Sequence, residues 1–169
     1  FEAVREAVGP DIEMLHDAAG CDYSLNEAIE VGRVLERLAF GWFEEPLDDR
    51  DLQGLQMLCD ALDIEILAPE TLMNDVDLSR VWLEIGATDK LRINGRLGTT
   101  AYLELAEVAQ NMRTTVEPNG PGGLFGHVHA HLCCAVENST YYEYFPNGSR
   151  DTVGKEIGLI NPPIPQEGE

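Results

Sequence analysis

Positive charge is scarce in this sequence. Its 169 residues contain 11 Lys plus Arg against 31 Asp plus Glu, and Lys90 and Lys155 are its only lysines. The formal net charge of -20 repels the phosphates of nucleic acids and of anionic membranes, so we expect neither as a partner. Such a charge favours a halophilic protein, since screening over about 3 Å at 1 M salt removes the self-repulsion of the fold. An acidic cytosolic protein without that adaptation is the alternative.

Long apolar runs and paired cysteines are also lacking. No stretch of 18 apolar residues argues for a membrane-spanning helix, while an apolar content of 44% is enough for one core. The four cysteines, Cys21, Cys59, Cys133 and Cys134, show no C-x-x-C spacing. We therefore expect free thiols in a reducing cytoplasm, and no signal peptide is visible.

The two ends of the sequence predict a fragment of a longer protein. Phe1 stands where an initiator Met would be, and FEAVREAVGP is typical of the last turns of a helix closed by Gly9 and Pro10. The segment 154–169 is punctuated by prolines and has no terminal element of its own.

Strand-like and helix-like segments alternate between those ends. Ser24 and Glu27 form the signature of a capping box ahead of apolar residues at helical spacing. The expected strands are 11–16, 39–44, 64–67, 90–93, 113–116 and 140–145, and the expected helices lie near 25–38, 52–62, 75–82, 99–112 and 124–136. Six strand segments alternating with helices in this way predict parallel strands covered by helices.

An open doubly wound sheet and a (β/α) barrel both satisfy this alternation. A doubly wound nucleotide site needs a glycine fingerprint after a first strand, and neither G-x-G-x-x-G nor G-x-x-x-x-G-K occurs at such a point. We therefore prefer the barrel, in which the carboxyl ends of the strands surround one pocket. The residues expected there are Asp17, Glu44, Glu70, Arg92, Asn119 and Glu143.

Three of those residues are acids at nearly even intervals. Glu44 follows Asp17 by 27 residues and Glu70 follows Glu44 by 26, about the length of one strand, one helix and two loops. Each acid closes a short apolar run, so the three carboxylates should leave neighbouring strands at one edge. Hard oxygen ligands gathered in this way predict a divalent-metal site. Glu45 should point away from it, because side chains alternate along a strand.

The segments around these acids resemble a known family. DIEMLHDAAGCDYSLNEA, WFEEPL and APE are similar to the mandelate racemase and muconate lactonizing enzyme branch of the enolase superfamily. The resemblance implies a capping domain followed by a TIM-type (β/α)7β barrel, here incomplete at its N-terminal side, without the first two strands and the capping domain. It assigns 1–153 to a partial barrel domain and 154–169 to a C-terminal tail that returns toward the capping domain. It also implies Mg²⁺ held by Asp17, Glu44 and Glu70.

The resemblance further implies an enzyme that removes the α-proton of a carboxylate substrate to give an enediolate. We expect a lyase, a dehydratase of a sugar acid such as an aldonate, with a lysine base on a strand outside this chain. An isomerase of the same superfamily, either a racemase, an epimerase or a cycloisomerase, is one alternative. A metal-binding barrel without catalysis is another. Family resemblance also favours a homo-oligomer.

Several positions depart from the family pattern. Arg92 stands where members carry a catalytic lysine, and because arginine stays protonated it is expected to hold a substrate carboxylate or stabilise charge. Asn94 and Asn119 occupy positions where racemases use an Asp and a His, and neither amide shuttles a proton, which weakens the two-base racemase alternative. Family members carry a polar residue near the metal two positions after the first acid, and this chain has Ala19 at that position.

Two further site residues are expected from the last third of the chain. Glu143 fits an acid that donates a hydrogen bond to the enediolate, which requires a protonated carboxyl. His127 belongs to HVHAH, whose spacing lacks the partners of a dedicated zinc site. Because its helix begins at a glycine-rich loop, we expect His127, with Asn94 and Asn119, to contact substrate.

Overall fold

The computed structural model describes residues 1–19, 21–120, 123–144 and 160. The chain divides into two compact units, one formed by residues 1–72 and 77–91 and the other by residues 73–76 and 92–169. Within the described part of the chain, no helix has the length and apolar character needed to cross a membrane.

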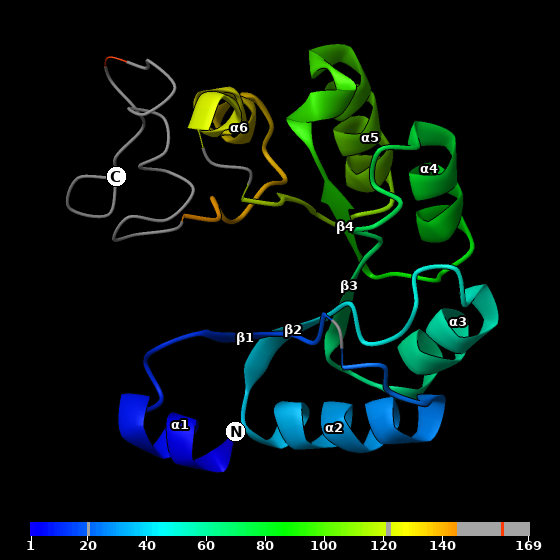
Figure 1. Ribbon diagram of the computed structural model, residues 1–169, viewed down its shortest axis with the longest axis vertical. Coiled ribbons are helices and arrows are strands. Elements are labelled where there is room, and N and C mark those ends of the chain that lie inside the picture. The colour runs from blue at the N-terminus through cyan, green and yellow to red at the C-terminus, as the bar shows by residue number, and fades with distance from the viewer. Residues whose placement is uncertain (20, 121–122, 145–159, 161–169) are drawn as a thin grey trace. The chain divides into compact units, whose positions relative to one another are not determined.

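The first unit repeats a strand and a helix. Its elements are α1 (Glu2–Val8), β1 (Met14–Asp17), α2 (Leu25–Arg37), β2 (Phe40–Glu44), α3 (Leu52–Ala61), β3 (Glu65–Ala68), most of α4 (Val76–Glu84) and the start of β4 (Lys90–Ile93) (Figure 1). β1 pairs with β2, β2 with β3, and β3 with β4, all in parallel. The predicted alternation of strands and helices is therefore confirmed through this unit.

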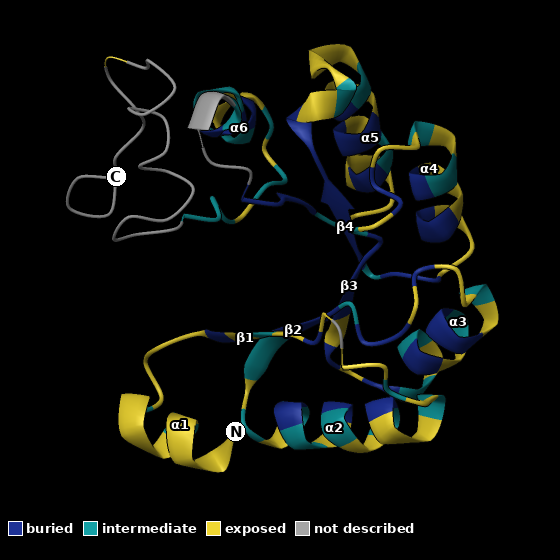
Figure 2. Ribbon diagram, viewed as in Figure 1, coloured by how far each residue is buried: buried dark blue, intermediate teal, exposed yellow. Residues whose placement is uncertain are grey.

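The capping signals in the sequence start and stop these helices. Ser24 is the N-cap of α2, and its backbone N–H donates to the Glu27 carboxylate at 2.9 Å, which completes the predicted capping box. Gly9 ends α1 with φ 78°, a left-handed conformation that favours glycine. α1 has no buried residue, whereas β3 and β4 are largely buried (Figure 2).

The core of the first unit forms where the helices cover the strands. α2 contacts both β2 and α3. Fully buried apolar side chains from these elements meet in one cluster that includes Leu35, Phe43, Leu55, Leu58 and Ile66. This packing holds the strands in register, so the positions of their carboxyl ends are determined by the core beneath them.

The second unit continues the alternation. It contains the end of β4, the 3-10 helix η1 (Gly95–Leu97), α5 (Thr99–Asn111), β5 (Val116–Pro118) and α6 (Gly123–Ala135). β5 neighbours β4 in the sheet, where the backbone N–H of Asn119 donates to the carbonyl of Ile93 at 3.2 Å. The strand order follows the chain order, β1-β2-β3-β4-β5, as expected for an α/β fold built from repeated units.

Three strand predictions need correction. The strand expected at 11–16 begins at Met14 and ends at Asp17. The strand expected at 113–116 begins at Val116 instead, because the preceding turn carries Arg113 in a left-handed conformation, φ 64°, which a strand does not accept. No strand is present in 140–144, the described part of the strand predicted at 140–145. There the backbone N–H groups of Thr140 and Tyr141 donate to the side-chain carboxylate of Glu117, each at 3.2 Å. The tail predicted at 154–169 lies outside the described residues, apart from Ile160.

Candidate functional site

Two of the three predicted metal ligands lie side by side at the ends of neighbouring strands. Asp17 is the register partner of Glu44, and the backbone N–H of Ala18 donates to the carbonyl of Glu44 at 2.9 Å. Register partners project to the same face of a sheet, so both carboxylates share one face. On the other face, the ring of His16 stacks on Phe43 with a centroid separation of 5.4 Å, as expected for the alternate residues.

The two carboxylates differ in their surroundings. Glu44 is only 4% exposed, and the indole N–H of Trp42 donates to its Oε2 at 3.3 Å. Asp17 is exposed, and its Oδ1 accepts the backbone N–H of Ala19 at 2.8 Å. A buried carboxylate beside a second acid is costly unless a cation or donors compensate its charge.

Glu70, the third predicted ligand, lies two residues beyond the end of β3. The next residue, Thr71, is anchored by Asp49, whose Oδ2 accepts the Thr71 backbone N–H at 2.7 Å and also its hydroxyl. Asp49 is 3% exposed, and its own carbonyl accepts the indole N–H of Trp82 at 2.8 Å. Burial raises the pKa of Asp49 against the opposing effect of the Thr71 hydrogen bonds, and Asp48 and Glu70 add to the increase.

Asp49 anchors the loop of Glu70, but the sequence does not distinguish it from the acid beside it. The turn contains two adjacent acids, and the neighbour Asp48 is exposed and accepts the backbone N–H of Arg50 at 2.8 Å. A local turn motif of this kind is readable from sequence, whereas the contact of Asp49 with Thr71 spans 22 residues.

A cavity of about 330 Å³ opens beside these strand ends. It is lined by residues that follow the predicted ligands in sequence: Ala19, Asp22, Glu45, Pro46, Leu47, Asp48, Asp49, Arg50 and Thr71. Glu45 therefore lines a space next to Glu44, with its backbone N–H donating to the carbonyl of Leu67 at 3.2 Å.

The predicted ligands of the first unit are of the chemical type that a hard divalent cation binds. Its members are carboxylates, the ligands that Mg²⁺ takes in proteins, and Asp17 and Glu44 already share a face. Across the described ranges, however, no three His, Cys, Asp or Glu side chains stand close enough together to form a ligand group. Strand register thus aligns two of the predicted ligands, and Glu70 lies in the loop that Asp49 anchors.

In the second unit, the predicted catalytic residues Arg92 and Glu143 form an ion pair. Arg92 is 4% exposed, and its Nη2 lies 2.8 Å from Glu143 Oε2. The same oxygen accepts the backbone N–H of Gly120 at 2.6 Å. In both contacts the carboxylate accepts, whereas the role predicted for Glu143 is that of a donor.

The segment that carries Glu143 is attached to β5 by a second acid. Glu117 is 1% exposed, and its Oε1 accepts the hydroxyl of Thr140 at 2.5 Å, in addition to the backbone N–H groups of Thr140 and Tyr141. Sequence reasoning missed Glu117, since a single acid inside a short strand shows no pattern of its own.

The predicted substrate residues Asn94 and Asn119 contact each other directly. Asn94 Nδ2 donates to Asn119 Oδ1, and both residues are buried, with exposed fractions of 0% and 6%. The Oδ1 of Asn94 also accepts the backbone N–H of Arg96 at 2.7 Å, which caps η1. His127, the third predicted substrate residue, is half-buried near the start of α6.

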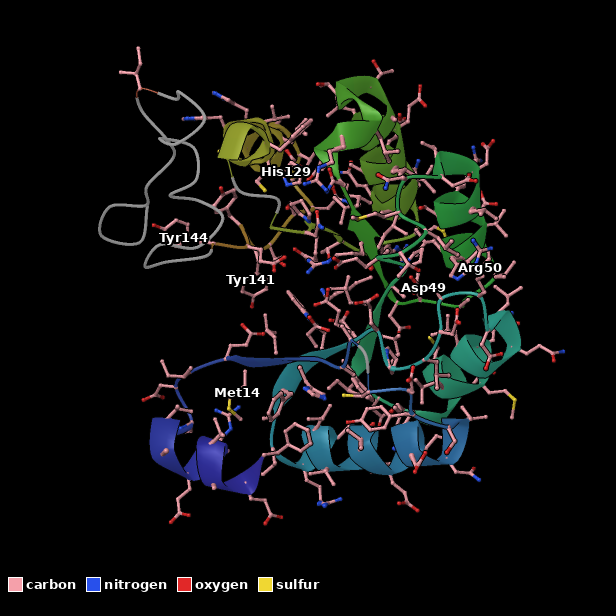
Figure 3. The ribbon with its side chains drawn as sticks, viewed as in Figure 1. Met14, Asp49, Arg50, His129, Tyr141 and Tyr144 are labelled. Atoms are coloured by element: carbon pink, nitrogen blue, oxygen red, sulfur yellow. The ribbon has the colours of Figure 1, made fainter. Side chains whose placement is uncertain are left out.

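The middle histidine of HVHAH contacts one member of this asparagine pair and the residue that follows the other. His129 is 1% exposed on α6 (Figure 3), with Nε2 2.7 Å from the backbone N of Gly95 and Nδ1 2.9 Å from the carbonyl oxygen of Asn119. Burial lowers the pKa of His129 to about 4, helped by the positive charges of Arg96 and Arg92 and opposed by the Asn119 hydrogen bond. The sequence analysis left His129 without a role at the site.

Residues 1–168 match the family described as Enolase C-terminal domain-like. An arabinonate dehydratase of Saccharolobus solfataricus is 29% identical over 165 residues, which is 92% of this chain and 42% of that protein. A D-Ala-D/L-Ala epimerase of Cytophaga hutchinsonii is 28% identical over 145 residues, which is 83% of this chain and 39% of that protein. The chain thus spans less than half the length of these relatives.

A solved structure with a similar fold is that of D-glucarate dehydratase from Agrobacterium tumefaciens, complexed with magnesium. The identity is 35%, the TM-score is 0.76, and the similarity covers 85% of this chain and 37% of the other. With the strand order above, this similarity confirms the α/β class and the incomplete TIM-type barrel predicted from the sequence.

Proposed function

The chain belongs to the Enolase C-terminal domain-like family of the enolase superfamily, and we propose that the complete protein is a magnesium-dependent dehydratase of a sugar acid. The observation that supports this most directly is the pairing of Asp17 with Glu44 at adjacent strand ends, in a chain similar to sugar-acid dehydratases. A carboxylate pair at that edge suits a cation that must also meet an anionic substrate.

We assign the metal to Asp17, Glu44 and Glu70. When bound, magnesium supplies positive charge that stabilises the negative charge formed as the α-proton of a carboxylate substrate is removed. Glu44 contributes a charge that is already buried and oriented by Trp42, and Asp17 lies beside it in register. Asp49 keeps the loop of Glu70 in place through Thr71.

Arg92 and Glu143 have a linked role in this proposal. Arg92 cannot serve as an ordinary base because a guanidinium stays protonated, so it binds an anionic oxygen of the substrate. A substrate anion that takes the place of Glu143 beside Arg92 leaves Glu143 next to the substrate, where it is proposed to donate a hydrogen bond to the enediolate.

The remaining groups suit a polyhydroxylated substrate. Asn94 and Asn119 offer amide groups, which both donate and accept and so match sugar hydroxyls, and His127 is proposed as a further contact. None of these amides shuttles a proton. We therefore place the base outside this chain and favour dehydration over a two-base racemisation. A cytoplasmic, homo-oligomeric and salt-adapted protein stays our prediction.

Epimerisation is the second candidate, favoured by the similarity to the D-Ala-D/L-Ala epimerase. The test incubates the complete protein and Mg²⁺ with arabinonate, gluconate, galactarate or glucarate and assays 2-keto-3-deoxy products, with a chelator as control. We expect keto product from at least one acid, and its loss with the chelator. Epimer formation without keto product would contradict the dehydratase proposal, and no turnover of any acid would favour the non-catalytic barrel.

A further inference from the structure

His129 bridges the ends of two strands through the two nitrogens of one ring. Its Nε2 lies 2.7 Å from the backbone N of Gly95, directly after Asn94, and its Nδ1 lies 2.9 Å from the carbonyl oxygen of Asn119. Gly95 can only donate through its N–H, so Nε2 must accept. The proton therefore resides on Nδ1 and is donated to Asn119, which defines one neutral tautomer.

The ring of His129 is buried and lies close to the backbone of Gly95. A Cβ at Gly95 would lie 2.9 Å from Cδ2 of His129 and 3.0 Å from Cδ1 of Leu132, so a glycine is needed for the ring to approach the backbone. His129 is 1% exposed, and its charged form would place an N–H against the N–H of Gly95. Burial accordingly lowers the pKa of His129 to about 4.

Asn119, which His129 contacts, and Asn94 belong to one hydrogen-bonded unit. Asn119 donates its backbone N–H to Ile93, accepts His129 at its backbone carbonyl, and accepts Asn94 at its side-chain oxygen. Asn94 is in turn fixed at Oδ1 by the N–H of Arg96. The orientation of both amides thus depends on the strand ends that His129 joins.

We propose that His129 is a positioning residue, which fixes Asn119, the less buried member of the asparagine pair, so that its amide can bind a hydroxyl group of the substrate. The inference deepens the proposed function and rests on it for the identity of the ligand. It concerns ground-state binding, because a fixed amide loses less conformational entropy when a hydroxyl group binds.

The first test measures steady-state kinetics of the complete protein with Mg²⁺ and the sugar acid that it dehydrates. His129→Phe keeps a ring but no hydrogen bonds, His129→Gln keeps a donor and an acceptor, and the exposed His131→Gln on the same helix is the matched control. We expect about a tenfold or larger rise in KM for His129→Phe, a smaller rise for His129→Gln, little change in kcat, and values within about twofold for the control. A fall in kcat at constant KM would indicate a merely structural role and overturn the inference.

A double variant tests whether His129 acts through Asn119. If it does, adding His129→Phe to Asn119→Ala raises KM no further, since the group that the ring positions is already gone. Independent, multiplying effects of the two substitutions would overturn the inference.

A spectroscopic test separates this inference from the proposed function. In protein labelled with ¹⁵N-asparagine, His129→Phe should shift or broaden the side-chain amide signals of Asn94 and Asn119, and His129→Gln serves where the Phe variant does not fold. Unchanged amide signals would overturn the positioning role, whether or not a sugar acid is turned over. Altered signals without turnover of any acid would support the positioning role and reject the dehydratase.

Discussion

The two units of this chain hold their predicted functional residues by different means. In the first unit, backbone pairing aligns Asp17 with Glu44, and the result is a concentration of negative charge at strand ends. In the second unit, side-chain contacts join Arg92 to Glu143 and Asn94 to Asn119 across separate elements. The negative charge of the first region is consistent with the proposed cation, whereas the second region is organised by its own hydrogen bonds.

The largest effect that would test this comparison is expected at Glu44. Glu44→Gln should lower dehydration by roughly a thousandfold, since it removes a metal ligand but keeps the size of the side chain and an acceptor for Trp42. Without Mg²⁺ the same variant should melt at a higher temperature, because a buried charge has been removed. Turnover assays, Mg²⁺ titrations and thermal melts measure these effects.

Glu45→Gln is the matched control for that substitution. Its activity should stay within a few-fold of the original protein, because Glu45 lines the neighbouring cavity and is not a proposed ligand. Equal losses for the two variants would contradict the choice of Glu44.

The next largest effect is expected in the second unit and depends on pH. Because the pKa of His129 is lowered to about 4, the unfolded chain, with a pKa near 6.5, binds the proton more readily. Stability from this group is complete above pH 6.5 and falls as the pH drops toward 4, by a total on the order of 3 kcal/mol. Arg92 and Arg96 supply the nearby charges that oppose protonation.

Denaturation of the original protein and of His129→Gln at several pH values measures this effect. The original protein should lose its stability advantage over His129→Gln as the pH falls from 7 to 4. The many carboxylates affect both proteins alike. A difference that does not change with pH would show that His129 is not held in its neutral form.

A smaller effect is expected at the loop that carries Glu70. Asp49→Ala should lower the free energy of unfolding by about 2 kcal/mol, because Thr71 loses its two hydrogen bonds to the buried Asp49 carboxylate. Asp48→Ala, at the exposed neighbour, should cost less than about 0.5 kcal/mol. Chemical denaturation measures the free energy of unfolding of both variants. Equal losses of stability would contradict the stabilising role of the contact between Asp49 and Thr71.

The smallest effect is expected at the start of α2, away from both predicted sites. Ser24→Ala should lower stability by about 1 kcal/mol through loss of the capping box with Glu27. The KM for the sugar acid should not change. A rise in KM would show that the packing of α2 reaches the functional residues of the chain.

Local rules account for most of the fold that could be predicted. The capping box at Ser24, the left-handed Gly9 and the apolar periodicity located α1 to α6 and five of the six expected strands. The strand prediction around Glu143 was wrong because the backbone N–H groups of Thr140 and Tyr141 donate to the carboxylate of Glu117. A local sequence pattern does not reveal such a distant partner.

Some residues of the candidate site could likewise be predicted from local spacing, and others could not. The even spacing of Asp17, Glu44 and Glu70 was readable because each strand and helix has a regular rise, and the register of Asp17 with Glu44 agrees with it. By contrast, nothing in the sequence separates Asp49 from Asp48, and helical periodicity places His129 on a different face from His127 and His131 without identifying its partners. Burial and partners distinguish them, and both are decided by residues far away in the chain.

The sequence by itself determined the order of elements, the family and the positions of the acids, because these depend on short-range periodicity and on motif spacing. Tertiary structure alone decided which polar groups are buried and what they contact: Asp49 with Thr71, Glu117 with Thr140, and His129 with Gly95 and Asn119. The physical reason is that a buried polar side chain is stable only with a partner, and folding brings that partner from another element.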